Sequence, residues 1–185
     1  ADAIRLSVFN VVSVITTTGF GLDDFITWGD FSVLIFSGLL FTGACSGSTA
    51  GGIKIFRFQI AFSLLKRQLM LLMHPHALFP QKYNNRKVSD EILRSLVAFV
   101  IAYMTTIAVS TLLLTLFGSH SMVALSASIT AVSNVGPGLV ESIGPSGNFA
   151  ALPAPSKWVL SIGMLMGRLE ILTVAVMLTR HFWRR

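Results

Sequence analysis

The chain has 185 residues, of which 53% are hydrophobic and only 12% are charged, and its mean hydropathy is +0.73. Soluble domains carry about 25% charged residues, so this chain has too little polar surface for a water-soluble globule. The composition excludes a disordered chain, argues against an ordinary cytosolic enzyme and is typical of a multi-pass membrane protein. The single cysteine, Cys45, excludes an internal disulfide framework and a cysteine-built zinc site.

The first ten residues do not have the pattern of a signal peptide. The chain does not begin with methionine, and its first ten residues lack the basic start, apolar core and cleavage site of a signal peptide. We therefore expect a piece of a longer protein.

Residues 4–15 are the first predicted element, an apolar stretch of about three helical turns. A bilayer core requires roughly 20 apolar residues, so this stretch is too short to span it. It ends in a polar, glycine-bearing run at residues 16–21 (TTTGFG). A short helix followed by such a run is typical of a re-entrant segment, which dips into the membrane and returns to the same side.

Residues 31–73 are predicted to make one crossing that an irregular loop interrupts. Residues 31–42 are apolar but too short to span alone, and residues 43–52 (GACSGSTAGG) are all small. From residue 53 to about 73 the pattern is helical again, with Lys54 and Arg57 just after the loop. These two bases fit a snorkelling cytoplasmic face and a gating contact about equally well.

Residues 96–117 form an uncharged apolar stretch that is long enough to be a transmembrane helix. Ser89, followed by two acidic residues, predicts a helix start just before it. A second short apolar stretch, residues 122–132, ends in another polar glycine run at residues 133–138 (SNVGPG). Residues 158–179 are again long enough to span, with Arg168 and Glu170 near the centre.

The charges orient these elements. Basic residues gather around the connection after residue 73 and at the C-terminus: Lys66, Arg67, Lys82, Arg86, Lys87, Arg94, Arg180, Arg184 and Arg185. The other side holds Asp23, Asp24, Asp30 and Glu141, with Lys157 as its only base. By the positive-inside rule, the linker and the C-terminus are cytoplasmic and both glycine turns face outside.

A short helix, a polar glycine turn and a membrane helix occur in this order twice. Gly19 and Gly136 lie 117 residues apart, and on this offset Ser13 meets Thr130, Thr16 meets Ser133, Gly21 meets Gly138 and Leu22 meets Leu139. The first copy begins at its short helix, without the leading helix that residues 96–117 give to the second. The shared order predicts that the two turns have the same role.

Such turns are suited to a cation. A run rich in glycine and hydroxyl residues can direct successive carbonyl oxygens at one axis, and rings of such oxygens replace the hydration shell of K⁺. Glycine permits backbone angles that other residues avoid, and the negative end of a short helix favours a cation. Ordinary glycine turns between membrane helices are the alternative.

Four segments together resemble the Trk/Ktr/HKT superfamily of potassium transporters, most of all its TrkH branch. They are residues 16–21, 43–54, 133–138 and 167–170, in the family's order over nearly the whole chain. The resemblance implies an all-α membrane protein built from membrane-helix/pore-helix/membrane-helix repeats of a K⁺-channel-like pore, with an interrupted helix. Residues 1–73 would be a partial third repeat, residues 74–94 a cytoplasmic linker and residues 95–185 the fourth repeat.

The resemblance also implies roles for individual residues. The K⁺ filter falls on Thr17, Thr18, Gly19, Phe20, Gly21, Asn134, Val135, Gly136, Pro137 and Gly138, with K⁺ held by the backbone carbonyls of Thr18, Gly19, Val135 and Gly136. Gating falls on Gly43, Ser46, Gly47, Ser48, Gly51, Gly52, Lys54 and Arg168. Two filter strands do not enclose an ion, so we do not expect the chain to conduct alone.

Arg168 is informative apart from the resemblance. A charge at the centre of a spanning helix costs about 2.5–3.5 kcal/mol on insertion scales, so its side chain should face protein or water. It could pair structurally with loop carbonyls. It could also act as a fixed positive charge beside the cation path and hold the loop of residues 43–52 closed.

The function that the resemblance implies is potassium uptake across the bacterial cytoplasmic (inner) membrane, with K⁺ as the transported ion and no organic cofactor. The implied partners are a cytosolic nucleotide-binding regulatory ring of the TrkA/KtrA type, a second full-length pore in a homodimer, and the lipid bilayer. The alternative is a non-conducting membrane scaffold or assembly subunit derived from such a transporter. We expect no nucleic acid partner, because the bases flank membrane segments, and no enzyme activity, because no nucleophile–base pair or paired carboxylates are present.

Overall fold

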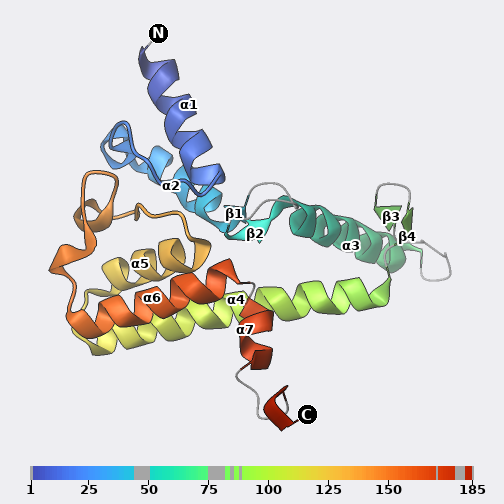
Figure 1. Cartoon of the computed structure of the whole chain (residues 1–185). Coiled ribbons are helices and arrows are strands. Elements are labelled where there is room, and N and C mark those ends of the chain that lie inside the picture. Colours follow the sequence, from blue (N-terminus) through green and yellow to red (C-terminus); the bar gives the residue numbers. More distant parts are fainter. Residues whose placement is uncertain are drawn as a thin grey trace.

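The computed structural model describes residues 2–43, 51–74, 82–83, 86–87, 89–169, 171–177 and 182–184. The described part is mainly helical (Figure 1). In chain order its elements are α1 (Asp2–Ile15), η1 (Phe25–Trp28), α2 (Asp30–Phe41), β1 (Thr42–Gly43), β2 (Ile53–Lys54), α3 (Ile55–Met73), β3 (Lys82–Tyr83), β4 (Arg86–Lys87), α4 (Asp90–Leu116), α5 (Ser121–Ser133), η2 (Glu141–Ile143), η3 (Phe149–Ala151), α6 (Ala154–Arg168), α7 (Ile171–Met177) and η4 (Phe182–Arg184).

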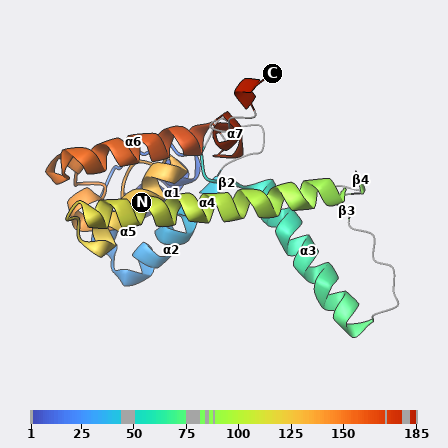
Figure 2. The same cartoon turned by 90° about the horizontal axis from the view of Figure 1, so that it is seen from below.

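Helices α4, α5 and α6 pack side by side and form the main body of the molecule (Figures 1 and 2). Helix α5 is enclosed by its neighbours, and its side chains from Ser126 to Ser133 are all buried. Its sequence is rich in alanine and serine, and small residues let neighbouring membrane helices approach closely. This short helix is therefore at the centre of the packing.

Helix α4 has 27 residues, so it is about 40 Å long. Its start is fixed by Ser89, whose hydroxyl accepts a hydrogen bond from the Ile92 N–H, as the sequence predicted. Within the described ranges it is the one helix long and apolar enough to cross a membrane, from Glu91 to Leu116. Leucines at 112 and 116 are exposed on its surface, as expected of a helix that faces lipid.

The first copy of the repeat folds as α1, η1 and α2. Phe25 and Phe36 stack with their ring centroids 4.0 Å apart, which holds η1 against α2. Asn10 is buried in α1, and its side chain donates to the carbonyl of Asp23 and accepts from the N–H of Leu22. These contacts fix the path of the chain after the first glycine turn.

The predicted interruption between residues 31 and 73 is present. Helix α2 ends at Phe41, and β1 and β2 form a parallel pair in which Thr42 lies opposite Ile53 and Gly43 opposite Lys54. Helix α3 then begins at Ile55 and projects away from α4 (Figure 2). Lys54 therefore lies in a short strand before the helix, whereas the sequence placed it on the helix itself.

The single helix expected over residues 158–179 is two helices in the structure, α6 and α7. Helix α6 starts after Pro153 and ends at Arg168, where the N–H of Leu169 bonds the carbonyl of Leu165. Helix α7 begins at Ile171 and turns away from α6 (Figure 1). The end of α6 lies against the end of α5, a contact that a hydropathy pattern does not record. Glu170 lies outside the described residues.

Candidate functional site

The two glycine turns meet in space. A methyl group built on Gly19 would overlap the carbonyl oxygen of Val135, and one built on Gly136 would lie 3.6 Å from the Cα of Gly19. The segments 117 residues apart in sequence are thus in direct backbone contact. Only a residue without a side chain fits at Gly19, which explains the glycine there.

The two turns also share one backbone conformation. Thr17 and Asn134 have left-handed φ angles of 55° and 57°, and two residues later Gly19 and Gly136 have φ angles of 79° and 115°. Left-handed angles are rare for a β-branched residue such as Thr17. Their recurrence at both copies, on the 117-residue offset, confirms the repeat that the sequence predicted.

The hydrogen bonds that close each helix into its turn match as well. The N–H of Thr18 bonds the carbonyl of Ser13 at 2.9 Å, and the N–H of Val135 bonds the carbonyl of Thr130 at 3.1 Å. Each donor precedes the turn glycine by one residue. Helices α1 and α5 therefore deliver their turns by the same local structure.

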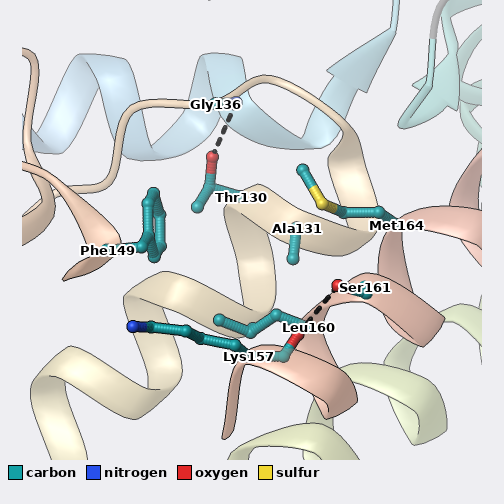
Figure 3. A pocket seen from close by; sticks show the side chains of 8 residues that line it. All are labelled: Thr130, Ala131, Gly136, Phe149, Lys157, Leu160, Ser161 and Met164. Carbon is teal, nitrogen blue, oxygen red and sulfur yellow. Dashed lines mark hydrogen bonds between the residues drawn. The ribbon is translucent and has the colours of Figure 1, made fainter. Parts of the chain in front are cut away.

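The second turn is braced by the helix that leads into it. The Thr130 hydroxyl accepts from the N–H of Gly136 at 3.1 Å and donates to the carbonyl of Pro137 at 3.0 Å. Figure 3 shows this hydroxyl directed at the turn, above a largely apolar cavity of about 220 Å³ that Lys157 and Phe149 also line. Val135 is buried, whereas Thr18 and Phe20 of the first turn are exposed.

The loops that follow the two turns are also in contact. The Ser146 hydroxyl contacts the Asp24 carboxylate, whose other oxygen caps η1 by accepting from the N–H of Ile26 at 3.0 Å. Gly21 lies close to Pro145: a methyl group on Gly21 would be 3.0 Å from the Pro145 Cβ. The loop after the second turn therefore rests on the loop after the first.

The end of α5 is also contacted by Gly51, which is predicted to gate, and by Gly167, which precedes the predicted gating residue Arg168. A methyl group on Gly51 would overlap the carbonyl oxygen of Ser133, and one on Gly167 would overlap that of Val132. Gly43 lies against the carbonyl oxygen of Gly51 in the same way. The end of the small-residue loop, the end of α6 and the start of the second turn thus meet at one place.

The charged residues predicted for gating lie near this junction. Arg168 is the exposed last residue of α6, next to Gly167. Lys54 pairs through its backbone with Gly43, and Gly52 has a φ angle of 73° just before β2. Ser46, Gly47 and Ser48 lie outside the described residues.

Two contacts at this site were missed by sequence reasoning. The Tyr103 hydroxyl lies 2.7 Å from the Ser133 hydroxyl, and both side chains are buried. The Asn134 side chain donates to the carbonyl of Met164 at 2.9 Å, which ties the turn to α6. A lone tyrosine within the apolar span of α4 was the available signal, because a buried phenol needs a hydrogen-bond partner.

Short pore helices with matched turns, an interrupted helix and a full membrane helix define an all-α membrane protein built from pore repeats. The family described as TrkH, cation transport protein, matches residues 1–183, and this chain belongs to that family.

Known relatives agree in sequence and in fold. The Trk system potassium uptake protein TrkI of Halomonas elongata is 55% identical over 177 residues, which are 96% of this chain and 36% of the relative. TrkH of Escherichia coli K12 is 35% identical over 181 residues, or 98% and 37% of the two chains. The crystal structure of the potassium transporter TrkH from Vibrio parahaemolyticus superposes with a TM-score of 0.90 at 34% identity, covering 99% of this chain and 38% of that one. The chain thus spans a little over a third of the relatives it matches.

Proposed function

We propose that this chain supplies two of the filter strands of a potassium uptake protein. The observation that carries the proposal is the backbone contact between Gly19 and Val135, made by two turns of the same conformation. Two pore strands must approach each other in this way to share one ion path. The relatives named as potassium uptake proteins support K⁺ as the cation.

In this proposal, residues 17–21 and 134–138 are the filter strands. The carbonyls of Thr18, Gly19, Val135 and Gly136 hold K⁺, as carbonyl rings do in potassium filters. The C-terminal ends of α1 and α5 lead into these turns, so the negative ends of both helix dipoles favour a cation there. K⁺ is cargo, and no organic cofactor is required.

The loop of residues 43–52 is the proposed gate. One of its last residues, Gly51, contacts Ser133 at the end of α5. Ser133 lies directly before the second proposed filter strand. Arg168 and Lys54 supply positive charge beside this loop. A cation would be repelled while the loop and these charges occupy the path, and would pass when the loop moves.

The proposal places the protein in the bacterial inner membrane, with the glycine turns outside and residues 74–94 and the C-terminus in the cytoplasm. The excess of Lys and Arg in that linker and at the C-terminus supports this orientation. The partners would be a cytosolic nucleotide-binding regulatory ring and a second copy of the full pore.

Replacement of the turn glycines tests the filter. Gly19→Ser and Gly136→Ser, made in the full-length gene product, should each lower the preference for K⁺ over Na⁺, because a side chain displaces the strands. Gly19→Ser should lower the preference more, because a Cβ at position 19 overlaps the Val135 carbonyl oxygen. A Cβ at position 136 would lie 3.6 Å from its nearest neighbour, the Cα of Gly19. The measurement is Rb⁺ uptake into proteoliposomes in competition with K⁺ and with Na⁺.

Gly118→Ser is the matched control for the filter test. Gly118 also has a positive φ, 86°, but a methyl group there meets nothing within 4 Å. It therefore carries the same kind of backbone strain at a site away from the turns. Unchanged ion preference in both turn variants would remove these glycines from the filter.

Shortening the loop tests the gate. Deletion of residues 46–48 should raise the rate of Rb⁺ uptake while ion preference stays as in the parent protein, because the filter turns are not altered. Deletion of residues 78–80, in the predicted cytoplasmic linker, is the control of equal length and should leave the rate unchanged. A parental rate after the loop deletion would argue against a gating role.

A further inference from the structure

Tyr103 stands out among the buried groups that the proposed function does not use. It lies in the middle of α4 with 1% of its surface exposed, and is among the largest side chains fully buried in the described structure. Its hydroxyl is 2.7 Å from that of Ser133, the last residue of α5, which is itself completely buried. This contact joins residues 30 positions apart in sequence, on the consecutive helices α4 and α5.

Ser133 occupies a sensitive place. It is followed by the left-handed Asn134 and then by Val135, whose carbonyl lies against Gly19. Its own carbonyl contacts Gly51 at the end of the proposed gate. A shift of Ser133 would therefore be passed directly to the proposed filter strand, which begins at the next residue, Asn134.

The rest of the Tyr103 side chain is held in place by a column of rings. Tyr103 stacks on Phe99 one turn earlier in α4, with ring centroids 5.9 Å apart. The guanidinium of Arg57 lies over the Phe99 ring, 3.7 Å from its centroid. Arg57 belongs to α3, the helix that follows the proposed gate. The stacked groups therefore extend from α3 to the Tyr103 hydroxyl, which lies beside the proposed filter strand. The ring contacts and the burial of Tyr103 thus both restrict the position of its phenol oxygen.

The first turn has no such support among the described residues. Thr16 takes the place of Ser133 in the first copy, but its hydroxyl bonds the Val12 carbonyl of its own helix and the Thr18 hydroxyl, each at 2.7 Å. Both bonds are local and exposed. The tyrosine anchor is therefore a property of the second turn and not of the repeat as such.

We propose that Tyr103 is a positioning residue for ion selectivity: its hydroxyl fixes the end of α5 and so sets the location of the Val135–Gly136 strand. This inference rests on the proposed potassium function. It goes beyond that function because it assigns part of the ion selectivity to Tyr103, a residue of α4 that lies outside both turns. Loss of the hydroxyl would leave the fold intact but allow the strand to relax, so that the filter admits Na⁺ more readily.

The test is Tyr103→Phe in the full-length gene product, which removes the hydroxyl and keeps the ring stack. We expect about a fivefold fall in the preference for K⁺ over Na⁺, the size that corresponds to one buried hydrogen bond. Ser133→Ala removes the other partner and should give a similar fall. The double variant should be no worse than either single one, because both remove the same contact. The readout is again competition of K⁺ and Na⁺ with Rb⁺ uptake, a ratio that a simple loss of folded protein does not change.

Thr106→Val is the matched control. Thr106 lies on the same helix, and its hydroxyl bonds only the Ala102 carbonyl one turn earlier, at 2.8 Å. This variant should keep the parental ion preference. An equal fall in Thr106→Val, or unchanged preference in both Tyr103→Phe and Ser133→Ala, would overturn the inference. If Tyr103→Phe does not accumulate, Ser133→Ala decides.

The outcomes separate this inference from the proposed function. If the parent protein prefers K⁺ and the Tyr103→Phe and Ser133→Ala variants prefer it equally, only the role of Tyr103 is contradicted. The proposed filter then stands. Parent protein that transports without preferring K⁺ contradicts the proposed filter, and the role of Tyr103 falls with it.

Discussion

Gly51 and Gly167 show what single residues contribute to this site. Each occupies a position where a methyl group would overlap a backbone carbonyl of the last turn of α5. A backbone carbonyl cannot rotate aside as a flexible side chain can, so these glycines are required by space rather than by turn geometry. They allow three segments to meet within one helical turn of the second glycine turn, the proposed filter strand.

Substitution at Gly167 should show this requirement. Gly167→Ala is expected to destabilise the protein by about 1–3 kcal/mol, the usual cost of overpacking. Gly38→Ala is the control: Gly38 lies inside α2 with nothing within 4 Å, and alanine there should stabilise the helix by about 0.5–1 kcal/mol. Thermal unfolding of the purified protein in detergent measures both. Shifts of the same sign and size would show that the contact with Val132 does not constrain position 167.

At the scale of elements, hydropathy and glycine placement predicted most of the fold. The three-turn apolar stretches became α1 and α5, the uncharged span became α4, and the 117-residue offset predicted the shared backbone of the turns. These features depend on local sequence, so local reasoning found them.

Features that depend on contacts between distant segments were missed. The end of α6 lies against α5, through the contact of Gly167 with Val132 and the hydrogen bond from the Asn134 side chain to the Met164 carbonyl. The β1–β2 pair joins residues on both sides of the small-residue loop. The hydroxyl pair of Tyr103 and Ser133 spans two helices. None of these partners is implied by the residues next to it in sequence.

At the scale of the whole molecule, the described surface is unusually apolar on α1. Ile4, Val8 and Val12 recur along this helix with exposed fractions of 71%, 56% and 52%. Such a stripe is covered by lipid or by further protein in a membrane. The relatives are more than two and a half times as long as this chain, so they contain further residues that can cover it.

This leads to an expectation about conduction. K⁺ and Rb⁺ should enter liposomes that contain the chain together with the upstream repeats, and should not enter liposomes that contain the 185 residues alone, because two strands leave the ion path open on its other sides. Selective uptake by the 185-residue chain alone would mean that copies assemble into a complete pore. If neither protein conducts, the non-conducting scaffold becomes the better description.

The parallel pairing of β1 and β2 has a consequence for variation in chain length. Partners in a sheet lie about 5 Å apart, so the chain returns beside the point from which it left. The pairing already holds the ends together, and the entropic cost of a longer connection grows only slowly with its length. Insertions or deletions between the two strands need not shift α2 relative to α3, so a change in length there acts on the proposed gate itself and leaves the two flanking helices in place.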